Sequence, residues 1–238
     1  MPEVERVLVV TAHPDDVDFG AAGTIATWTD QGIEVTYCVV TDGDAGGHDP
    51  AVNRADIPGI RRAEQTAAAK EVGVTDVVFL GYPDGSLTVT VELRWDIARV
   101  IRSVRPDRVL AQWPERNWKS MFASHPDHMA AGEATMCAVY PDARNPFAFP
   151  NLPGERLPAH VVDEVWMMGS PTPDTWVDVT DTFDRKVAAL RRHVSQMDPS
   201  RDVSGFLRTF LGASAAAGGL PDGRLAEAFL RLRTGERP

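Results

Sequence analysis

The chain has little cysteine and lacks any long apolar run. Its 238 residues include two cysteines, Cys38 and Cys137, and neither belongs to a C-x-x-C pair. We therefore expect no disulfide or metal staple in the fold, and we interpret both cysteines as small buried apolar residues. No apolar stretch approaches the roughly 18 residues of a membrane span, and the acidic first residues do not resemble a signal peptide. These absences predict a cytoplasmic protein.

Positive charge is also scarce. The chain has 24 Lys and Arg against 34 Asp and Glu, which is a formal net charge of −10. Nucleic-acid binders and proteins that sit on anionic membranes usually present a cationic face, so we expect neither partner. The hydrophobic fraction of 43% is typical of a globular protein. The length allows one large domain or two small ones, and we expect a single domain over residues 1–238.

Short β-branched runs alternate with helical patterns in the first half of the chain. The expected strands are Val7–Val10, Val35–Val40, Val77–Leu80 and Arg108–Gln112, and the helices between them are Gly23–Gln31, Ile60–Val72 and Leu93–Val104. Such continuous apolar strands are typical of a sheet that is buried on both faces. The repeated βα unit predicts an α/β fold with a Rossmann-like, mostly parallel sheet flanked by helices.

The second half is less regular. Residues 141–160 contain five prolines and predict a long loop that packs over the core through Phe147 and Phe149. The patterns that follow are late strands at Glu164–Met168 and Trp176–Val179, an amphipathic helix at Thr182–Gln196 and two shorter helical patterns. We therefore expect an irregular C-terminal part.

Imidazoles and carboxylates follow the expected strands where each strand ends. These segments are Thr11–Asp18, Thr41–His48, Gly81–Gly85 and Ser124–His128. In an open parallel sheet, such loops meet at one crevice where ligands bind. We therefore expect their polar side chains to share one rim.

Two pairs at this rim have the spacing of metal ligands. His13 and Asp16 lie three residues apart, and so do His125 and His128. A catalytic zinc ion takes three protein ligands and leaves a position for water. These four residues therefore offer one more candidate ligand than such an ion requires. Asp15, beside a candidate ligand, is a candidate general base. Either pair alone is more often a helix cap or a solvated loop.

The same segments resemble a known family. AHPDDVDFGAAGTIA at residues 12–26, together with HPDH at 125–128, is similar to the PIG-L or LmbE-like family of metal-dependent N-deacetylases. Weaker matches follow in order at Thr41–Gly47, from Arg61, from Phe79 and from Asp178, so the resemblance covers residues 4 to about 197. It implies an LmbE-like α/β fold.

The resemblance implies roles for the rim residues. His13, Asp16 and His128 would bind the metal, which is zinc or, as an alternative, iron. Asp15 would activate the attacking water as general base. His125 would stabilise the oxyanion or protonate the leaving amine, and Asp127 would orient an imidazole or tune its charge.

Two further residues are implied as substrate contacts. Arg61 occupies the position that holds a substrate hydroxyl or phosphate, although Arg62 competes for this role and an ion pair between Arg61 and Glu64 is an equal alternative. Asp84 would accept a sugar hydroxyl or serve only as a turn residue.

The chain departs from the family pattern in two places. Val17 stands where the commonest motif has Glu. The stretch Trp113–Ser124 is longer than the usual link before HPDH. Its Trp118, Met121 and Phe122 form either a lid over the site or ordinary packing contacts, and we favour the lid.

The function expected from the resemblance is hydrolysis of an N-acyl group, above all N-acetyl, on a small molecule that contains an amino sugar. The alternative within the family is an amidase that cleaves a mycothiol-type thiol conjugate. Alternatives from other classes are a non-catalytic metal-binding relative and a nucleotide-binding protein. The resemblance also allows a homo-oligomer.

Overall fold

One mixed sheet runs through the chain in the computed structural model, which describes residues 4–47, 49–119, 121, 124–149, 157–198 and 200–234. The strands are β1 (Arg6–Thr11), β2 (Glu34–Thr41), β3 (Asp76–Tyr82), β4 (Arg108–Gln112), β5 (Glu164–Met168), β6 (Thr175–Asp178) and β7 (Ala226–Arg233). Their order is β3-β2-β1-β4-β5-β7-β6, and only the pairings of β7 with β5 and β6 are antiparallel. The predicted mostly parallel α/β fold is confirmed.

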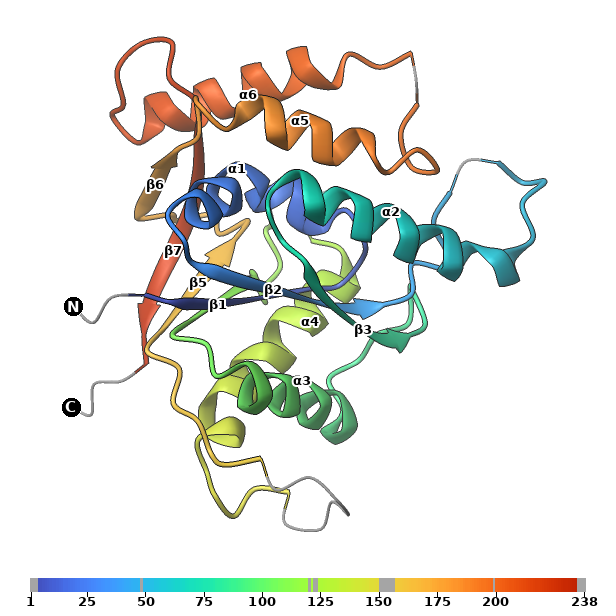
Figure 1. Cartoon of the computed structure of the whole chain (residues 1–238), viewed down its shortest axis with the longest axis vertical. Helices are drawn as coiled ribbons and strands as arrows, with labels where there is room; N and C mark the ends of the chain where they lie inside the picture. The colour runs from blue at the N-terminus through green and yellow to red at the C-terminus, as the bar shows by residue number, and fades with distance from the viewer. Residues whose placement is uncertain are drawn as a thin grey trace.

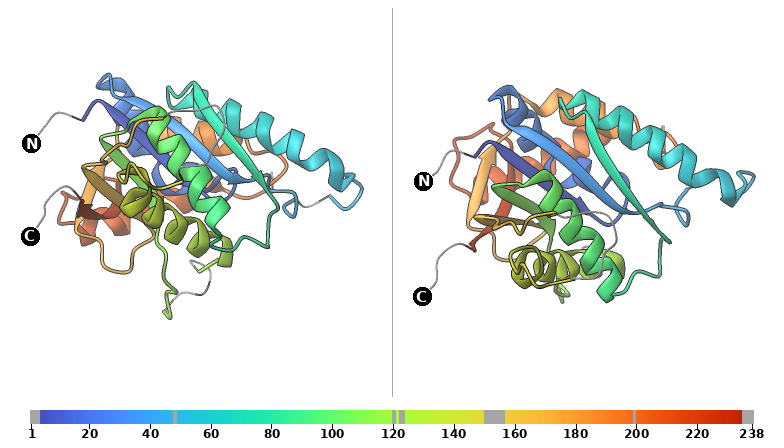
Figure 2. Two further views of the ribbon diagram at one scale, coloured as in Figure 1. Left: turned by 90° about the horizontal axis from the view of Figure 1, so that it is seen from below. Right: turned by 60° about the horizontal axis from the view of Figure 1, so that its bottom comes forward.

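Helices cover both faces of this sheet (Figure 1). They are α1 (Asp16–Asp30), α2 (Ile57–Glu71), α3 (Val91–Val104), α4 (Pro126–Cys137), α5 (Phe183–Arg191) and α6 (Val203–Ala217), with a short 3-10 turn at Arg54–Asp56 and a π turn at Ala138–Ala143. Side chains of β1 alternate between the two layers: Val7 and Val9 pack with α1 and α2, whereas Leu8 and Val10 pack with α3 and α4. Figure 2 shows α3 and α4 together on their face of the sheet.

The strand order has a topological switch point between β1 and β4. The helix after β1 lies on one face of the sheet, and the helix after β4 lies on the other face (Figure 1). The loops that leave these two neighbouring strands therefore diverge, as they do at the ligand-binding switch point of other open α/β sheets. The side chain of Gln112 joins the two strand ends, since its Oε1 accepts a hydrogen bond from the Ala12 backbone N–H at 2.8 Å.

Helix α4 lies very close to the end of β4. A Cβ atom at Gly132 would lie 2.3 Å from the carbonyl oxygen of Gln112 and 3.2 Å from Cα of Pro114. Only glycine fits this contact without a shift of the helix. The close approach places the first turn of α4 at the switch point.

The end of the chain differs from the prediction. We expected two short helical patterns, but the structure has the 15-residue helix α6 followed by the strand β7. Strand β7 is inserted between β5 and β6 and pairs with both, so its side chains are buried by neighbours that are distant in the sequence. A local pattern does not contain that information.

Smaller corrections concern helix ends and one loop. Helix α1 begins at Asp16 rather than at the expected Gly23. The sequence did not indicate this earlier start, because the helix is buried along most of its length and shows little amphipathic period. Helix α5 ends at Arg191, before the expected Gln196. In the 141–160 loop, Phe149 packs against Trp95 with ring centroids 4.6 Å apart, but Phe147 is 84% exposed and does not pack over the core.

One of the two cysteines is buried, as expected, and the other is only partly buried. Cys38 is buried in β2, and Cys137, at the end of α4, is half-buried. Among the described residues, no helix combines the length and the apolar character that a membrane span requires.

Candidate active site

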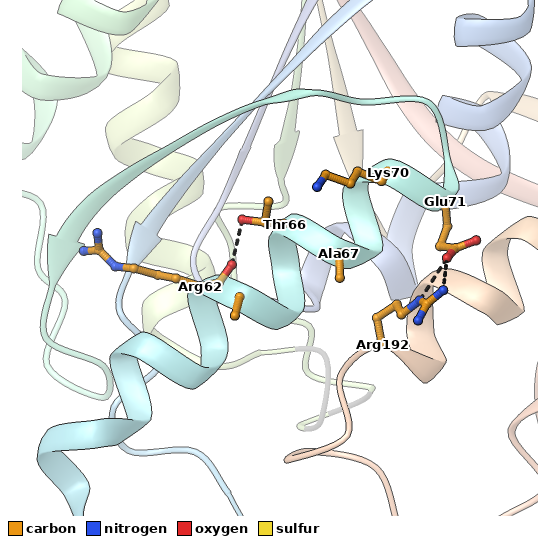
Figure 3. A pocket seen from close by; sticks show the side chains of 7 residues that line it. Arg62, Thr66, Ala67, Lys70, Glu71 and Arg192 are labelled. Atoms are coloured by element: carbon orange, nitrogen blue, oxygen red, sulfur yellow. Dashed lines mark hydrogen bonds and ion pairs between the residues drawn. The ribbon is translucent and has the colours of Figure 1, made fainter.

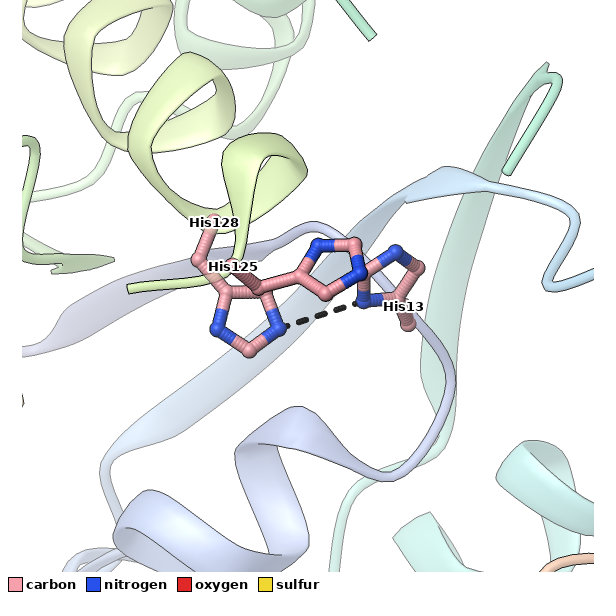
Figure 4. A group of neighbouring side chains, drawn as sticks. All are labelled: His13, His125 and His128. Carbon is pink, nitrogen blue, oxygen red and sulfur yellow. Dashed lines mark hydrogen bonds between the residues drawn. The ribbon is translucent and has the colours of Figure 1, made fainter. Parts of the chain in front are cut away.

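Three histidines meet where β1 and β4 end (Figure 4). His13 follows β1, His125 caps the N-terminus of α4, and His128 lies in the first turn of that helix. The rings of His13 and His125 have centroids 4.8 Å apart, and those of His125 and His128 5.1 Å apart. The nitrogens of the three rings lie close enough together to hold a metal ion.

The predicted ligand set also converges. His13 Nδ1 lies 3.2 Å from His128 Nε2. Of the two Asp16 carboxylate oxygens, Oδ2 lies 3.4 Å from His13 Nδ1 and Oδ1 lies 3.0 Å from His128 Nε2. Ligand atoms in a tetrahedral zinc site are about 3.3 Å apart, given zinc–nitrogen bonds of about 2.0–2.1 Å. The three side chains therefore fit such an ion.

Asp84 and Asp127 contact the other side of the His13 ring. His13 Nε2 lies 3.0 Å from Asp84 Oδ1 and 3.2 Å from Asp127 Oδ2. Asp127 is fully buried and also accepts the backbone N–H groups of Gly85 and Leu87. These three side chains could themselves hold a cation. Alternatively, the carboxylates accept the Nε2–H of His13 and so direct its Nδ1 toward Asp16 and His128, as carboxylates beside metal-binding histidines do.

His125 has a defined tautomer. Its Nδ1 accepts the backbone N–H of Asp127 at 3.2 Å, which caps α4. In the neutral ring the proton therefore sits on Nε2. Burial, reinforced by the positive charges of His13 and His128, lowers the pKa of His125. The His125 side chain is thus a neutral hydrogen-bond donor. The Asp127 carboxylate contacts a different imidazole, that of His13.

The charges of the ligand cluster stabilise one another. Burial disfavours the cationic form of His13, but hydrogen bonds to Asp16 and Asp84 outweigh it and raise the pKa of His13 to about 11. Burial also opposes ionisation of Asp16, yet the charge of His128 and hydrogen bonds from both histidines hold the pKa of Asp16 well below its usual range. Without a metal, the cluster is therefore held together by protonated imidazole.

Asp15 has a strained backbone at the start of α1. Its φ of 91° lies in the left-handed region, which costs a residue other than glycine about 1–3 kcal/mol. The Asp15 N–H donates to Gln65 Oε1 at 2.7 Å, and the carboxylate accepts from Arg61 Nη2 at 3.2 Å. Burial, followed by the charge of Asp16, raises the pKa of Asp15 to about 7, although Arg61 opposes the shift. A carboxylate with this pKa can accept a proton near neutral pH.

Arg61 is buried against Asp15. Its guanidinium is bonded to Pro14 O as well as to Asp15, and a Cβ atom at Gly46 would lie 2.3 Å from its Nη1. The ion pair with Glu64 that we considered is wrong, since Glu64 binds Ser195 instead. A direct substrate contact of Arg61 stays a prediction.

The competing arginine and the turn residues have other partners. Arg62 pairs with Asp42 at 2.6 Å. The Asp84 N–H donates to Asp44 Oδ1 at 2.9 Å, so Asp84 is both a turn residue and a partner of His13. Its predicted contact with a sugar hydroxyl stays a prediction.

The predicted lid is only partly visible. Trp118 is 83% exposed and Met121 is 64% exposed, whereas Trp113 packs against the core. Phe122, and likewise His48 of the second loop, lie outside the described residues. The lid therefore stays a prediction.

The prediction missed three supporting residues. Gln65, Asp18 and His193 are all fully buried beside Asp15, and Gln65 joins Asp15 to Asp18. Gln65 follows Arg61 by four residues, which places both on one face of α2 and is the signal that could have found it. His193 is 175 residues from its partner Asp18, and no local pattern connects them.

A separate surface hollow lies along α2 (Figure 3). Arg62, Thr66, Lys70, Glu71 and Arg192 line it, and Arg192 is paired with Glu71. None of the metal-ligand candidates lines this hollow.

Comparison with known proteins identifies a family for this chain. Residues 8–139 match the PIG-L family, described as GlcNAc-PI de-N-acetylase. Diacetylchitobiose deacetylase from Thermococcus kodakarensis is 34% identical over 201 residues, which cover 82% of this chain and 71% of that protein. Probable N-acetyl-alpha-D-glucosaminyl L-malate deacetylase 2 from Bacillus cereus is 35% identical over 203 residues, which cover 81% of this chain and 84% of that protein.

A solved structure shares the whole fold. N,N'-diacetylchitobiose deacetylase from Pyrococcus horikoshii, complexed with its inhibitor MPG, superposes with a TM-score of 0.87 at 30% identity. The superposition covers 97% of this chain and 85% of that chain. The motifs, the fold and the extent of these matches together show that this chain belongs to the PIG-L family of de-N-acetylases.

Proposed function

We propose that this protein is a metal-dependent hydrolase that removes an N-acetyl group from a small molecule containing an amino sugar. The observation that carries the proposal is the convergence of the His13, Asp16 and His128 side chains, next in the chain to Asp15, whose carboxyl pKa is raised to about 7. The names of the relatives support the substrate class, since they are deacetylases of diacetylchitobiose and of N-acetylglucosaminyl malate.

The ion would be held by His13, Asp16 and His128. We propose zinc, because two imidazoles and one carboxylate suit it, with iron as the alternative. When bound, the ion supplies Lewis-acid activation of the acetamide carbonyl and of the attacking water.

The side chains around the ion would then perform the proton transfers. Asp15 accepts a proton from the water as it attacks the carbonyl carbon. The Nε2–H of His125 donates a hydrogen bond to the carbonyl oxygen as negative charge develops there. The proton that Asp15 accepted from the water passes to the amine nitrogen when the C–N bond breaks, which yields acetate and a free amine.

The remaining side chains would position these groups. Asp84 and Asp127 hold the His13 ring through its Nε2, as their distances of 3.0 Å and 3.2 Å allow. We propose that Asp84 also accepts a substrate hydroxyl, as the family resemblance implies. Arg61 donates a hydrogen bond to the Asp15 carboxylate and is the second proposed substrate contact.

A substrate panel tests this function. Purified protein is incubated with N-acetylglucosamine, diacetylchitobiose, N-acetylglucosaminyl malate and a mycothiol-type thiol conjugate. Each substrate is tested with untreated protein, after chelation and after addition of zinc or ferrous iron. We expect amine and acetate to appear in equal amounts, to vanish on chelation and to return with metal. Release of amine without acetate from a thiol conjugate would favour the amidase alternative, and no metal-dependent release from any substrate would contradict the proposal.

A further inference from the structure

A buried chain of hydrogen bonds reaches the backbone of Asp15 from a distant part of the sequence. The Asp15 N–H donates to Gln65 Oε1 at 2.7 Å, and Gln65 Nε2 donates to Asp18 Oδ2 at 2.9 Å. The same Asp18 oxygen lies 2.8 Å from His193 Nε2. The Asp18 and His193 side chains are 0% exposed, so water does not compete for these bonds.

One arrangement of protons satisfies all of these contacts. With Asp18 as a carboxylate, which only accepts hydrogen bonds, the Gln65 amide and the His193 Nε2–H both donate to its Oδ2. The Gln65 carbonyl oxygen is then fixed toward the Asp15 N–H. Because a buried carboxylate is costly unless it is hydrogen-bonded, loss of the His193 donor would disturb the side chain that orients Gln65.

The turn that carries His193 also holds helix α2. The backbone N–H and the Oγ of Ser195 each donate to the Glu64 carboxylate at 2.7 Å. Glu64 and Gln65 are adjacent on α2, and the same helix carries Arg61, which binds the Asp15 carboxylate. The backbone and the side chain of Asp15 are therefore both held from α2, and the 193–195 turn contacts α1 and α2 together.

We propose that His193 is a positioning residue for the general base. Through Asp18 and Gln65, it holds Asp15 in the left-handed backbone conformation that aims its carboxylate at the site of reaction. This inference rests on the proposed function for its kinetic consequence, but the conformation of Asp15 can be measured without any substrate. A displacement of a catalytic group by about 1 Å can lower the rate by about 100-fold.

The variants separate positioning from simple loss of stability. His193→Leu removes the donor, His193→Gln keeps an amide N–H near the place of Nε2, and Gln65→Met removes the link to the Asp15 backbone. His160→Leu is the matched control, because His160 is a half-buried histidine whose Nε2 bonds Pro106 O at 2.7 Å, just before β4 and at the opposite end of that strand from the site. Each protein is tested for zinc content, thermal midpoint, kcat and KM on the best substrate, and for the crystal structure around Asp15.

We expect His193→Leu and Gln65→Met to lower kcat by about 10-fold to 100-fold, with KM and zinc content within about twofold of wild type. His193→Gln should recover most of kcat, and His160→Leu should lower only the thermal midpoint. In the crystal structures of the two impaired variants, Asp15 should leave its φ of 91°.

The opposite results overturn the inference. If folded His193→Leu turns over like His160→Leu and keeps Asp15 in the left-handed region, His193 is only structural. Should His193→Leu fail to fold, Gln65→Met decides by the same two measurements. If the wild type hydrolyses no substrate, the proposed function fails, and the Asp15 conformation in the variants still decides whether the chain of bonds positions it.

Discussion

At the scale of single residues, His125 and His128 are three apart in sequence but have different surroundings. His128 Nε2 faces His13 and Asp16, whereas His125 Nδ1 is occupied by the Asp127 N–H. We therefore predict that His128→Ala loses the metal. We predict that His125→Ala keeps it and loses about 100-fold or more in kcat, as for removal of an oxyanion donor. Zinc content by atomic absorption, together with kcat, checks both variants. Loss of zinc from His125→Ala would instead favour the ligand group His13, His125 and His128.

Zinc binding through His13 should depend on pH. The pKa of His13 is raised to about 11 in the metal-free protein, so the ring is protonated at pH 8, whereas a metal binds only the unprotonated ring. Zinc must therefore displace a proton, and its apparent affinity should rise about tenfold per pH unit in the range below that pKa. Calorimetric titration of the apo protein at pH 8 in two buffers of different ionisation enthalpy measures the proton release. Binding without any proton release would show that His13 is not a ligand.

At the scale of elements, the contact between α4 and β4 determines where the two histidines of α4 lie. Gly132→Ala places a Cβ atom 2.3 Å from Gln112 O and forces the helix away from the strand. We predict a loss of about 1–3 kcal/mol in the free energy of unfolding, as for overpacking elsewhere, and weaker zinc binding.

A matched glycine controls for the change in helix propensity. Gly212 lies in α6 with nothing within 4 Å of its hypothetical Cβ atom. Gly212→Ala should therefore increase the free energy of unfolding by about 0.4–1 kcal/mol. Urea denaturation measures both variants. Equal stability of Gly132→Ala and wild type would mean that the helix is free to shift.

The elements themselves were predictable to different degrees. Strands β1, β2 and β4 were found because β-branched runs buried on both faces leave a strong local signal. Strand β7 was missed because its burial depends on β5 and β6, which are far away in the chain. The start of α1 was missed because a helix buried along most of its length shows little amphipathic period.

The site residues were likewise predictable where the signal is local and not where it depends on distant parts of the chain. His13, Asp16 and His128 were predictable because they lie in short motifs at strand ends, and the structure brings all three together. The contact between Asp84 and His13 joins the loops after β3 and β1, and the contact between His193 and Asp18 joins the turn after α5 to helix α1. Such contacts depend on how the units pack, and no single motif contains them.

At the scale of the whole molecule, we propose that residues 1–238 behave as one domain. The two principal core clusters lie on opposite faces of the same sheet, so β1 contributes Leu8 to one and Val9 to the other. Unfolding of one layer exposes the other, and calorimetry should show a single transition. Two separated transitions would contradict the single-domain prediction.

Metal binding should stabilise this unit. The ligands come from the loop and helix after β1 and from the helix after β4, so an ion joins elements on opposite faces of the sheet. At zinc concentrations about 100 times the dissociation constant, the expected gain is about 2.7 kcal/mol. For a domain of this size, that gain corresponds to a rise in the melting temperature of about 5–10 °C. An unchanged melting temperature with zinc bound would contradict the predicted ligand set.

The most direct test of the central claim is turnover by Asp15→Asn at known zinc content. Asparagine keeps the size and the Arg61-facing oxygen of the side chain but does not accept the proton of the attacking water. We predict zinc binding equal to that of wild type, with deacetylation of the best N-acetylglucosaminyl substrate reduced by about 100-fold to 10,000-fold. Turnover at the wild-type rate with zinc bound would show that Asp15 is not the base and would contradict the proposed mechanism.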